Sequence, residues 1–441
     1  MKPFRQTFLL AILMSMVGVS SSAHDLEVKN VDDVPIYYNY IKNGTELEVT
    51  YRGSSYKAFN HEYSKVVYIP AEVNYMGKTY KVTRIGDEAF KYCYTVTEIT
   101  LPNSITSIGN YAFSHFTSNY KGRTIVIPEK VTSIGDYAFE NCFLLKYIKI
   151  PKSVTSIGKD AFSGCSGLTE VRIDDIAAWC RIKFYDCHSN PLILKDVSLY
   201  LTNVGTINDL VIPEDVLRIG ESAFSGSDLT SVTIPRNLSS IGEDAFWLCF
   251  DLEKVIVPDI AAWCRITFYN SDSNPLKYAK HLYKDSKTEI KDLVIPEGVT
   301  NIGSYAFENC NSLTSVTIPN GVLYLGYNAF NFTNSAENLV SIVSQIENPK
   351  DVNESAFSAG LYANAVLYVP VGTTEKYKAC KGWQKFVRIE EGLPSGINDV
   401  VNTQATVSKH YNLSGKQLAQ PQQGFNIVRM NDGSIRKVVI K

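Results

Sequence analysis

The stretch Ile127-Pro-Glu-Lys-Val-Thr-Ser-Ile-Gly135-Asp-Tyr-Ala-Phe139-Glu-Asn-Cys142 contains a motif that the chain repeats along most of its length. The motif is an apolar residue followed by Pro, then Ile-Gly, then Ala-Phe a few residues later. Neighbouring copies are mostly 22 or 23 residues apart, and self-similarity at such a short period is the signature of a repeat architecture. The Ile-Gly pairs, one of which has Leu for Ile, begin at Ile85, Ile108, Ile134, Ile157, Ile219, Ile241, Ile302 and Leu325.

Each position of the repeat has a physical reason. In Leu229-Thr-Ser-Val-Thr-Ile234 the apolar residues alternate with hydroxyl residues, which predicts a short strand with one buried face. Pro235 lacks an N–H and marks the end of that strand. Gly242 is expected to let the chain turn sharply, because glycine has no Cβ and can adopt a positive φ.

The Ala-Phe segment is expected to form a single helical turn, capped by the polar residue that follows the Gly. In that turn Ala138, Phe139 and Cys142 would point into the core. A unit of about 23 residues cannot close a core alone, whereas stacked units bury one continuous apolar column. The sequence therefore predicts a repeat solenoid that is mainly β with short helical turns. The polar residues expected to act as caps include Asp87, Asn110 and Asp136.

A longer period overlies the first. The segment 175–182, Asp-Ile-Ala-Ala-Trp-Cys-Arg-Ile, returns at 259–266, and Ser-Asn-Pro-Leu at 189–192 returns at 273–276. We interpret both inserts as degenerate repeats that bulge from the spine and keep the stack continuous. Because the residues around Trp179 and Trp263 are apolar, we expect both indoles to anchor the inserts rather than to stack on a ligand.

These motifs resemble the BspA-like leucine-rich repeat family of bacterial surface proteins. The Trp-bearing inserts, the entry segment 73–82 and the exit segment 366–370 resemble those of Bacteroidales members. The resemblance covers roughly residues 35–392. It implies a leucine-rich-repeat-like right-handed stack of about 23-residue units, with a role in surface interaction rather than catalysis.

The termini differ in character from the repeats. Lys2 and Arg5, an apolar run and the small residues before His24 predict a secretory signal peptide, so we expect an exported protein at the cell surface or outside the cell, with the periplasm as an alternative. The alternating apolar residues of the tail predict hairpins and resemble Bacteroidetes C-terminal domains, either a type IX sorting domain or a module without a sorting role. The expected organisation is a signal peptide at 1–23, an N-terminal β cap at 24–81, a solenoid at 82–340 with inserts at 174–212 and 258–295, a C-terminal repeat cap at 341–392, and a linker with a small β module at 393–441.

Composition and motifs argue against several function classes. The 43 basic and 45 acidic residues give a net charge of -2, which does not favour nucleic acid as a partner. Five of the nine cysteines share one repeat position that elsewhere holds Phe116, Ser227 or Thr333, so packing is favoured over disulfides, although Cys142 and Cys165 could come within bonding range. The nearest approach to a zinc site is Cys180, Cys187 and His188, and the second insert does not keep it. We expect no enzyme, no metal and no cofactor, and no membrane span after signal removal.

If the protein binds a partner, the exposed side of the repeat strands is the expected surface. This row is charged in the early repeats and rich in hydroxyls later, which suits a protein or a large extracellular polymer and an adhesin role. The alternatives are ordinary solvated sheet, and carbohydrate capture or scaffolding in an outer-membrane glycan-utilisation system. The candidate residues are Glu98, Thr100, Tyr147, Lys149, Glu170, Arg172, Ser231, Thr233, Lys254, Ser315 and Thr317.

Overall fold

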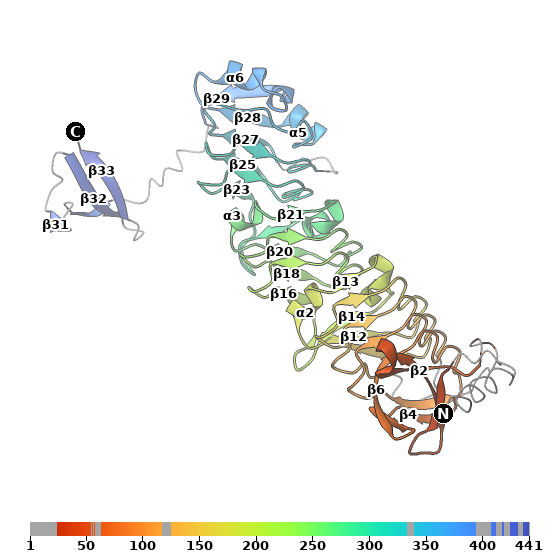
Figure 1. Ribbon diagram of the computed structural model, residues 1–441. Helices are drawn as coiled ribbons and strands as arrows, with labels where there is room; N and C mark the ends of the chain where they lie inside the picture. The colour runs from red at the N-terminus through yellow and green to blue at the C-terminus, as the bar shows by residue number, and fades with distance from the viewer. Residues whose placement is uncertain are drawn as a thin grey trace, which may run out of the picture.

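The computed structural model describes residues 24–53, 55, 57, 63–116, 125–332 and 339–393, together with four strands between 407 and 440. The described repeats form an elongated solenoid that runs from a group of N-terminal strands to a helical C-terminal end (Figure 1). The predicted signal peptide, residues 1–23, lies outside the described residues. Within the described part, no helix has both the length and the apolar character needed to cross a membrane.

The N-terminal strands begin as an antiparallel sheet and lead into the parallel strands of the solenoid. The first three strands pair antiparallel in sequence order, with a short 3-10 helix between the second and the third. The third strand then pairs in parallel with β6, which also pairs antiparallel with β5. These elements are β1 (Leu26–Lys29), β2 (Pro35–Ile41), η1 (Lys42–Gly44), β3 (Glu46–Thr50), β5 (Glu72–Tyr75) and β6 (Lys78–Ile85).

One side of the solenoid, which we call the sheet wall, is made of parallel strands that mostly have three to five residues. The wall consists of successive sheets, and antiparallel pairing after β14 and β22 closes two of them. The strands are β4 (Lys65–Tyr68) and β7 (Val96–Thr100); β10 (Tyr147–Ile150), β12 (Glu170–Ile173), β14 (Ser198–Leu201) and β15 (Gly205–Thr206); β16 (Asp209–Val211), β18 (Ser231–Thr233), β20 (Lys254–Ile256) and β22 (Leu282–Tyr283); and β23 (Asp292–Val294), β25 (Ser315–Ile318), β27 (Ser341–Ser344), β28 (Val366–Val369) and β29 (Arg388–Glu391).

A second side, the short-strand wall, is made of two-residue strands that end in the Ile of the Ile-Gly pairs or its equivalent. These strands also pair in parallel, so that Ser133, for example, lies between Ser107 and Ser156. They are β8 (Ser107–Ile108), β9 (Ser133–Ile134), β11 (Ser156–Ile157) and β13 (Lys183–Phe184); β17 (Arg218–Ile219), β19 (Ser240–Ile241) and β21 (Thr267–Phe268); and β24 (Asn301–Ile302) and β26 (Tyr324–Leu325).

The Ala-Phe segments form the third side and fill the core. Phe90, Phe113, Phe139 and Phe162 stack in a column, with 5.3 Å between successive ring centroids. All four are buried, and the Ala that precedes each of them is buried as well. The inward prediction for the Ala-Phe pair is confirmed. Such a column stabilises the solenoid along its length, because each buried aromatic ring contributes about 1.5–3 kcal/mol.

The expected helical turn at Ala-Phe is not formed. The segment is a hydrogen-bonded turn, in which the residue before Ala has a positive φ, such as 54° at Tyr137. The prediction that Gly242 adopts a positive φ is wrong, because the turn places that conformation on the residue before Ala. The backbone instead bonds from repeat to repeat, and the Phe139 N–H donates to the Ala161 carbonyl at 2.8 Å. The expected caps also act between repeats: the Asp136 carboxylate accepts the backbone N–H of Lys159 at 2.7 Å. Asp87 and Asn110 make the same contact with Asn110 and Asp136.

The two inserts keep this third side continuous. Trp179 and Trp263 are each 1% exposed, and their indole N–H groups donate to the carbonyls of Ala223 and Ala306 at 2.8 and 2.7 Å. The prediction that both indoles anchor the inserts is therefore confirmed. The helical segments of the inserts are α2 (Ile176–Cys180), η2 (Cys187–Ser189) and η3 (Pro191–Ile193) in the first, and α3 (Ile260–Trp263), η4 (Ser271–Ser273) and α4 (Leu276–Ala279) in the second.

The C-terminal end of the solenoid is closed by α5 (Ala359–Asn364), α6 (Thr374–Ala379) and η5 (Trp383–Lys385), which lie beside the last strands (Figure 1). Further along the chain, the predicted hairpins of the tail are confirmed as an antiparallel sheet in the order β31-β30-β32-β33. Its strands are β30 (Val407–Tyr411), β31 (Gln417–Leu418), β32 (Gly424–Met430) and β33 (Ile435–Ile440).

Candidate functional site

All eleven predicted partner-binding residues lie on strands of the sheet wall, but the structure brings only some of them together. Tyr147 and Lys149 on β10 lie beside Glu170 and Arg172 on β12, in direct cross-strand register. The remaining candidates lie on β7, β18, β20 and β25. We call the group on β10, β12 and β14 the first-sheet cluster, and it comprises Tyr147, Lys149, Glu170, Arg172 and Tyr200.

An arginine between two aromatic rings forms the centre of this cluster. The guanidinium carbon of Arg172 lies 3.8 Å from the ring centroid of Tyr147 and 5.2 Å from that of Tyr200. Glu170 holds the same guanidinium through contacts of 2.7 and 2.8 Å. The Arg172 side chain is still 36% exposed. A cation fixed over aromatic faces is attracted to them and loses little further freedom when a partner binds.

Lys149 extends the cluster toward the N-terminus. Its ammonium lies 2.8 Å from Asp174 and 2.9 Å from Glu129, and these two carboxylates raise the pKa of Lys149, with Asp174 contributing first. Partial burial raises the pKa of Asp174, but hydrogen bonds from Lys149 and Thr202 outweigh it and leave this pKa below its usual value. Lys149 and Asp174 therefore stay ionised at neutral pH, so that the face presents both signs.

The two candidate serines of the later repeats are engaged within the wall. The prediction that Ser231 faces solvent is wrong, because it is 7% exposed and its hydroxyl donates to the Asp209 carboxylate at 2.5 Å. Ser315 makes the equivalent bond to Asp292 at 2.6 Å, and hydrogen bonds from Ser315 and Thr314 lower the pKa of Asp292. Both serine hydroxyls therefore donate to an aspartate of the neighbouring strand.

The other candidates lie apart from the first-sheet cluster. Thr100 is exposed and Glu98 half-buried on β7, while Thr233 and Thr317 are half-buried on the later sheets. Lys254 lies over the Tyr283 ring, with 5.7 Å between its ammonium and the ring centroid.

Sequence reasoning missed Tyr200, which belongs to the first insert and lies opposite Arg172. The alternation Ser198-Leu-Tyr-Leu201 was the signal that could have placed Tyr200 on the same face, since it marks a strand whose Ser and Tyr point outward.

The cysteines of the shared repeat position pack as the sequence predicted. Cys142, Cys165 and Cys249 are buried free thiols, and the Sγ atoms lie 3.0–3.1 Å from the Phe carbonyls of the preceding repeat. Ser227 occupies the same position and lies 3.4 Å from the Cys249 sulfur. Burial raises the pKa of Cys249, and likewise of Cys310, to about 12. Thiols in this setting are neither nucleophiles nor metal ligands at neutral pH.

The nearest approach to a zinc site also fails on geometry. Among the residues that the structure describes, no group of three or more His, Cys, Asp or Glu side chains could hold a metal ion. The Cys187 sulfur lies 3.4 Å from Nδ1 of His188. Cys180 is buried in the core, and burial raises its pKa to about 12.

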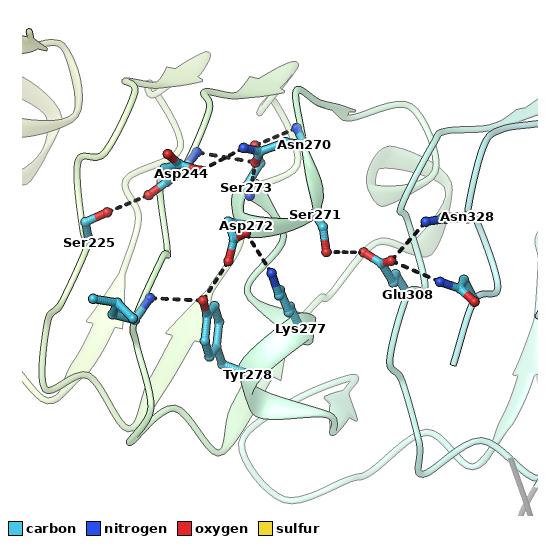
Figure 2. A network of polar contacts seen from close by, with 12 residues as sticks. Ser225, Asp244, Asn270, Ser271, Asp272, Ser273, Lys277, Tyr278, Glu308 and Asn328 are labelled. Carbon is cyan, nitrogen blue, oxygen red and sulfur yellow. Dashed lines mark hydrogen bonds and ion pairs between the residues drawn. The ribbon is translucent and has the colours of Figure 1, made fainter. Parts of the chain in front are cut away.

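In the second insert the equivalent loop is held by a polar network (Figure 2). Asp272 pairs with Lys277 at 2.6 Å, and the Ser271 hydroxyl donates to Glu308 at 2.5 Å. The other oxygen of Glu308 accepts from Asn328 at 3.2 Å. Glu308 is 3% exposed, and burial raises its pKa. Since both of its oxygens have donors, the network fixes the loop instead of offering an open site.

Comparison with known proteins identifies the repeat. A family model described as the BspA type leucine-rich repeat region matches in six copies at residues 57–191, 199–281 and 277–368, which together make up more than half of the chain. No curated protein matches the chain.

Solved structures with a similar fold come from several bacteria. A leucine-rich repeat protein from Bacteroides ovatus is 22% identical, with 84% of this chain and 100% of that one covered and a TM-score of 0.39. The pneumococcal vaccine antigen PcpA is 16% identical over 84% of this chain and 100% of its own, with a TM-score of 0.42. A leucine-rich cell surface protein from Faecalibacterium prausnitzii is 20% identical over 84% and 96%, with a TM-score of 0.34.

Proposed function

Because the chain belongs to the BspA-type leucine-rich repeat family, we propose that it is an exported surface protein that binds a protein partner, as an adhesin, through the first-sheet cluster. The observation that carries this proposal is the position of Arg172 between Tyr147 and Tyr200 on an open strand face. Tyrosine and arginine are enriched among the residues that dominate the energetics of protein interfaces. A tyrosine ring buries a large contact area from few rotatable bonds.

The arrangement of the cluster supports binding over ordinary solvated sheet. An isolated surface ion pair contributes little to stability, because it costs entropy to hold two long side chains in one geometry. Arg172, in contrast, is held by two rings and one carboxylate at once. The side chain is thus preorganised while still more than a third exposed. Preorganised aromatic and guanidinium groups raise affinity mainly by lowering the cost of ordering on binding.

The test is binding of the purified protein to a panel of extracellular matrix proteins and to intact bacterial cells. For a ligand found in this way, Arg172→Ala and Tyr200→Ala are expected to weaken binding about tenfold or more. Thr317→Ala, on β25 of the last sheet, is the matched control and should bind like the wild type. Unchanged affinity of both cluster variants, with unchanged melting temperatures, would remove the cluster from the binding surface.

A further inference from the structure

The short-strand wall is interrupted between β13 and β17, and a groove of about 340 Å³ lies at this break. Here residues 180–182 take the place of a strand, and the Gly220 N–H donates to the Cys180 carbonyl at 2.8 Å. The buried Ile182 and Ile219 contribute apolar lining. We call this site the basic groove. Its polar and aromatic lining comprises Arg181, Lys183, Arg218, Glu221 and Tyr269.

Close main-chain packing keeps the groove hollow. A Cβ on Gly220 would lie 2.7 Å from the Ile182 carbonyl oxygen, and one on Gly242 would lie 2.5 Å from the Glu221 nitrogen. Both rungs must therefore carry glycine, and neither fills the groove with a side chain. At the next rung, in register with Gly242, the chain carries Tyr269, which is 57% exposed and borders the groove.

The charges in the groove are unbalanced. Arg181 contacts Asp215 at 3.4 Å and remains 61% exposed. Lys183 and Arg218 are exposed, and neither side chain pairs with an acid in the part of the chain that the structure describes. Glu221 is the one carboxylate among the lining residues that the structure describes. Two cations without an acidic partner, next to the apolar lining of the groove, favour an anionic ligand.

The second insert builds the same break without this charge. The positions equivalent to Lys183 and Arg218 are Thr267 on β21 and Asn301 on β24. The Gly303 N–H donates to the Cys264 carbonyl at 2.9 Å, just as Gly220 does to Cys180. The backbone of the break therefore does not require the two cations, and a structural role does not explain them.

From this geometry we infer that the basic groove binds a carboxylate-bearing sugar, the acidic unit of an anionic glycan. The carboxylate lies between Arg218, which can bind it through two parallel hydrogen bonds, and the Lys183 ammonium. Glu221 accepts hydrogen bonds from sugar hydroxyls, and the exposed Tyr269 ring packs against the apolar face of the sugar. The volume is at the small end of ligand sites, which suits one or two sugar units.

An acidic peptide fits the same residues less well. Its carboxylates could pair with Lys183 and Arg218, but Glu221 would then face a ligand that carries a negative charge on each acidic residue. A uronic or sialic acid combines one carboxylate with several hydroxyl donors, which matches two free cations beside one carboxylate acceptor. This site lies on a different wall from the first-sheet cluster and goes beyond the protein-binding function proposed above.

Titration calorimetry of the full exported chain with trigalacturonate and with sialyllactose tests the inference, with maltotriose as the neutral probe. We expect one of the acidic probes to bind, more weakly as salt concentration rises, and maltotriose not to bind. The double variant Lys183→Thr/Arg218→Asn, which gives the first break the residues of the second, should weaken binding about tenfold or more. Both side chains are exposed, so the melting temperature should not change.

The duplication supplies the reciprocal experiment. Thr267→Lys/Asn301→Arg transfers the two cations to the second break, where Ser304 stands in place of Glu221, and should add a second, weaker site for the acidic probe. Arg172→Ala should leave this binding unchanged, which separates the groove from the proposed protein-binding face. The inference is overturned if neither acidic probe binds, if maltotriose binds equally well, or if Lys183→Thr/Arg218→Asn has no effect. Tighter binding of a polyglutamate peptide than of either sugar would assign the groove to acidic peptides.

Discussion

The two Trp inserts share the contacts that build the fold and differ in the residues that face solvent. In each copy an aspartate caps the short helix: the Asp175 side chain accepts the Ala178 N–H, and the Asp259 side chain accepts the Ala262 N–H. In each copy a buried asparagine donates to carbonyls of the following Ala-Phe turn, Asn190 in the first and Asn274 in the second. The asparagine contacts join each insert to the repeat that follows it, which gives both copies the same structural reason to keep them.

Several differences lie at exposed or half-buried positions of the same inserts. Lys183 in the first copy corresponds to Thr267 in the second, and Cys187-His188 corresponds to Ser271-Asp272. A duplicated segment acts as an internal control, because both copies meet the same packing demands. Residues that both copies keep are explained by the fold, and residues that one copy alone carries are the ones to examine for function. The predictions below test this division.

The largest effect is expected at the shared tryptophans. Trp179→Ala and Trp263→Ala should each lower the free energy of unfolding by about 3–5 kcal/mol, because each leaves a large cavity and removes a donor from a buried carbonyl. Urea denaturation followed by far-UV circular dichroism measures this loss. Phe139→Ala, which removes one ring from the column of a plain repeat, is the control and should cost a similar amount. A loss of only a few tenths of a kcal/mol in one copy would mean that the inserts are not equivalent.

A smaller loss is expected at the shared asparagines. Asn190 is fully buried, and its amide donates to the Ser222 and Ala223 carbonyls at 2.7 and 3.0 Å and accepts the Leu192 N–H at 3.0 Å. Asn190→Ala should therefore cost about 1–3 kcal/mol, since the backbone groups stay buried without partners.

Asn274→Ala should match Asn190→Ala in the same urea denaturation. Asn237 is a suitable control, because it is exposed and makes a single bond to the Glu214 carbonyl. Asn237→Ala is expected to change stability by less than about 0.5 kcal/mol. An equal cost at Asn190 and Asn237 would contradict a stabilising role for the buried hydrogen bonds of Asn190.

The repeat and its core could be read from the sequence, because period and side-chain pattern are local properties. The eight Ile-Gly and Ala-Phe pairs placed Phe139 inward, and the apolar flanks placed Trp179 inward as well. The helical turn was a wrong expectation for a physical reason. The turn around Tyr137, which has a positive φ, donates its backbone N–H groups to carbonyls of the next repeat. The sequence pattern of one repeat does not show such hydrogen bonds between repeats.

The candidate sites were less predictable for the same reason. Ser231 was expected at the surface from its strand position, but its exposure depends on Asp209 in the neighbouring strand. Arg172 was predicted to lie on the binding face, but its partner Tyr200 is 28 residues away in the chain, in an insert whose strand was not predicted. The basic groove depends on the break at Gly220, and only a comparison of Lys183 and Arg218 with Thr267 and Asn301 would have drawn attention to it.

The smallest predicted effect concerns a buried acid that only the second copy carries. Glu308 follows Ala-Phe after the second insert, where the first copy has Ser225. Burial raises the pKa of Glu308 above its unfolded value, so ionisation costs stability once the pH exceeds the unfolded value. The cost is fully present above the folded pKa and absent below the unfolded pKa. Glu308→Gln removes it and keeps an acceptor for Asn328 and Asn331, while its amide N–H can donate to the Ser271 hydroxyl, which donates to the carboxylate in the wild type.

Glu308→Gln should therefore melt at a higher temperature than the wild type at pH 7, and the difference should shrink to zero as the pH falls below about 4. Asp292→Asn is the control of opposite sign, because hydrogen bonds from Ser315 and Thr314 lower the pKa of Asp292. That variant should melt below the wild type at pH 7, and acidification should remove the deficit. Thermal melts of the three proteins between pH 3 and pH 8 measure both trends. A pH-independent difference for Glu308→Gln would show that the pKa of the Glu308 carboxyl is not raised in the folded protein.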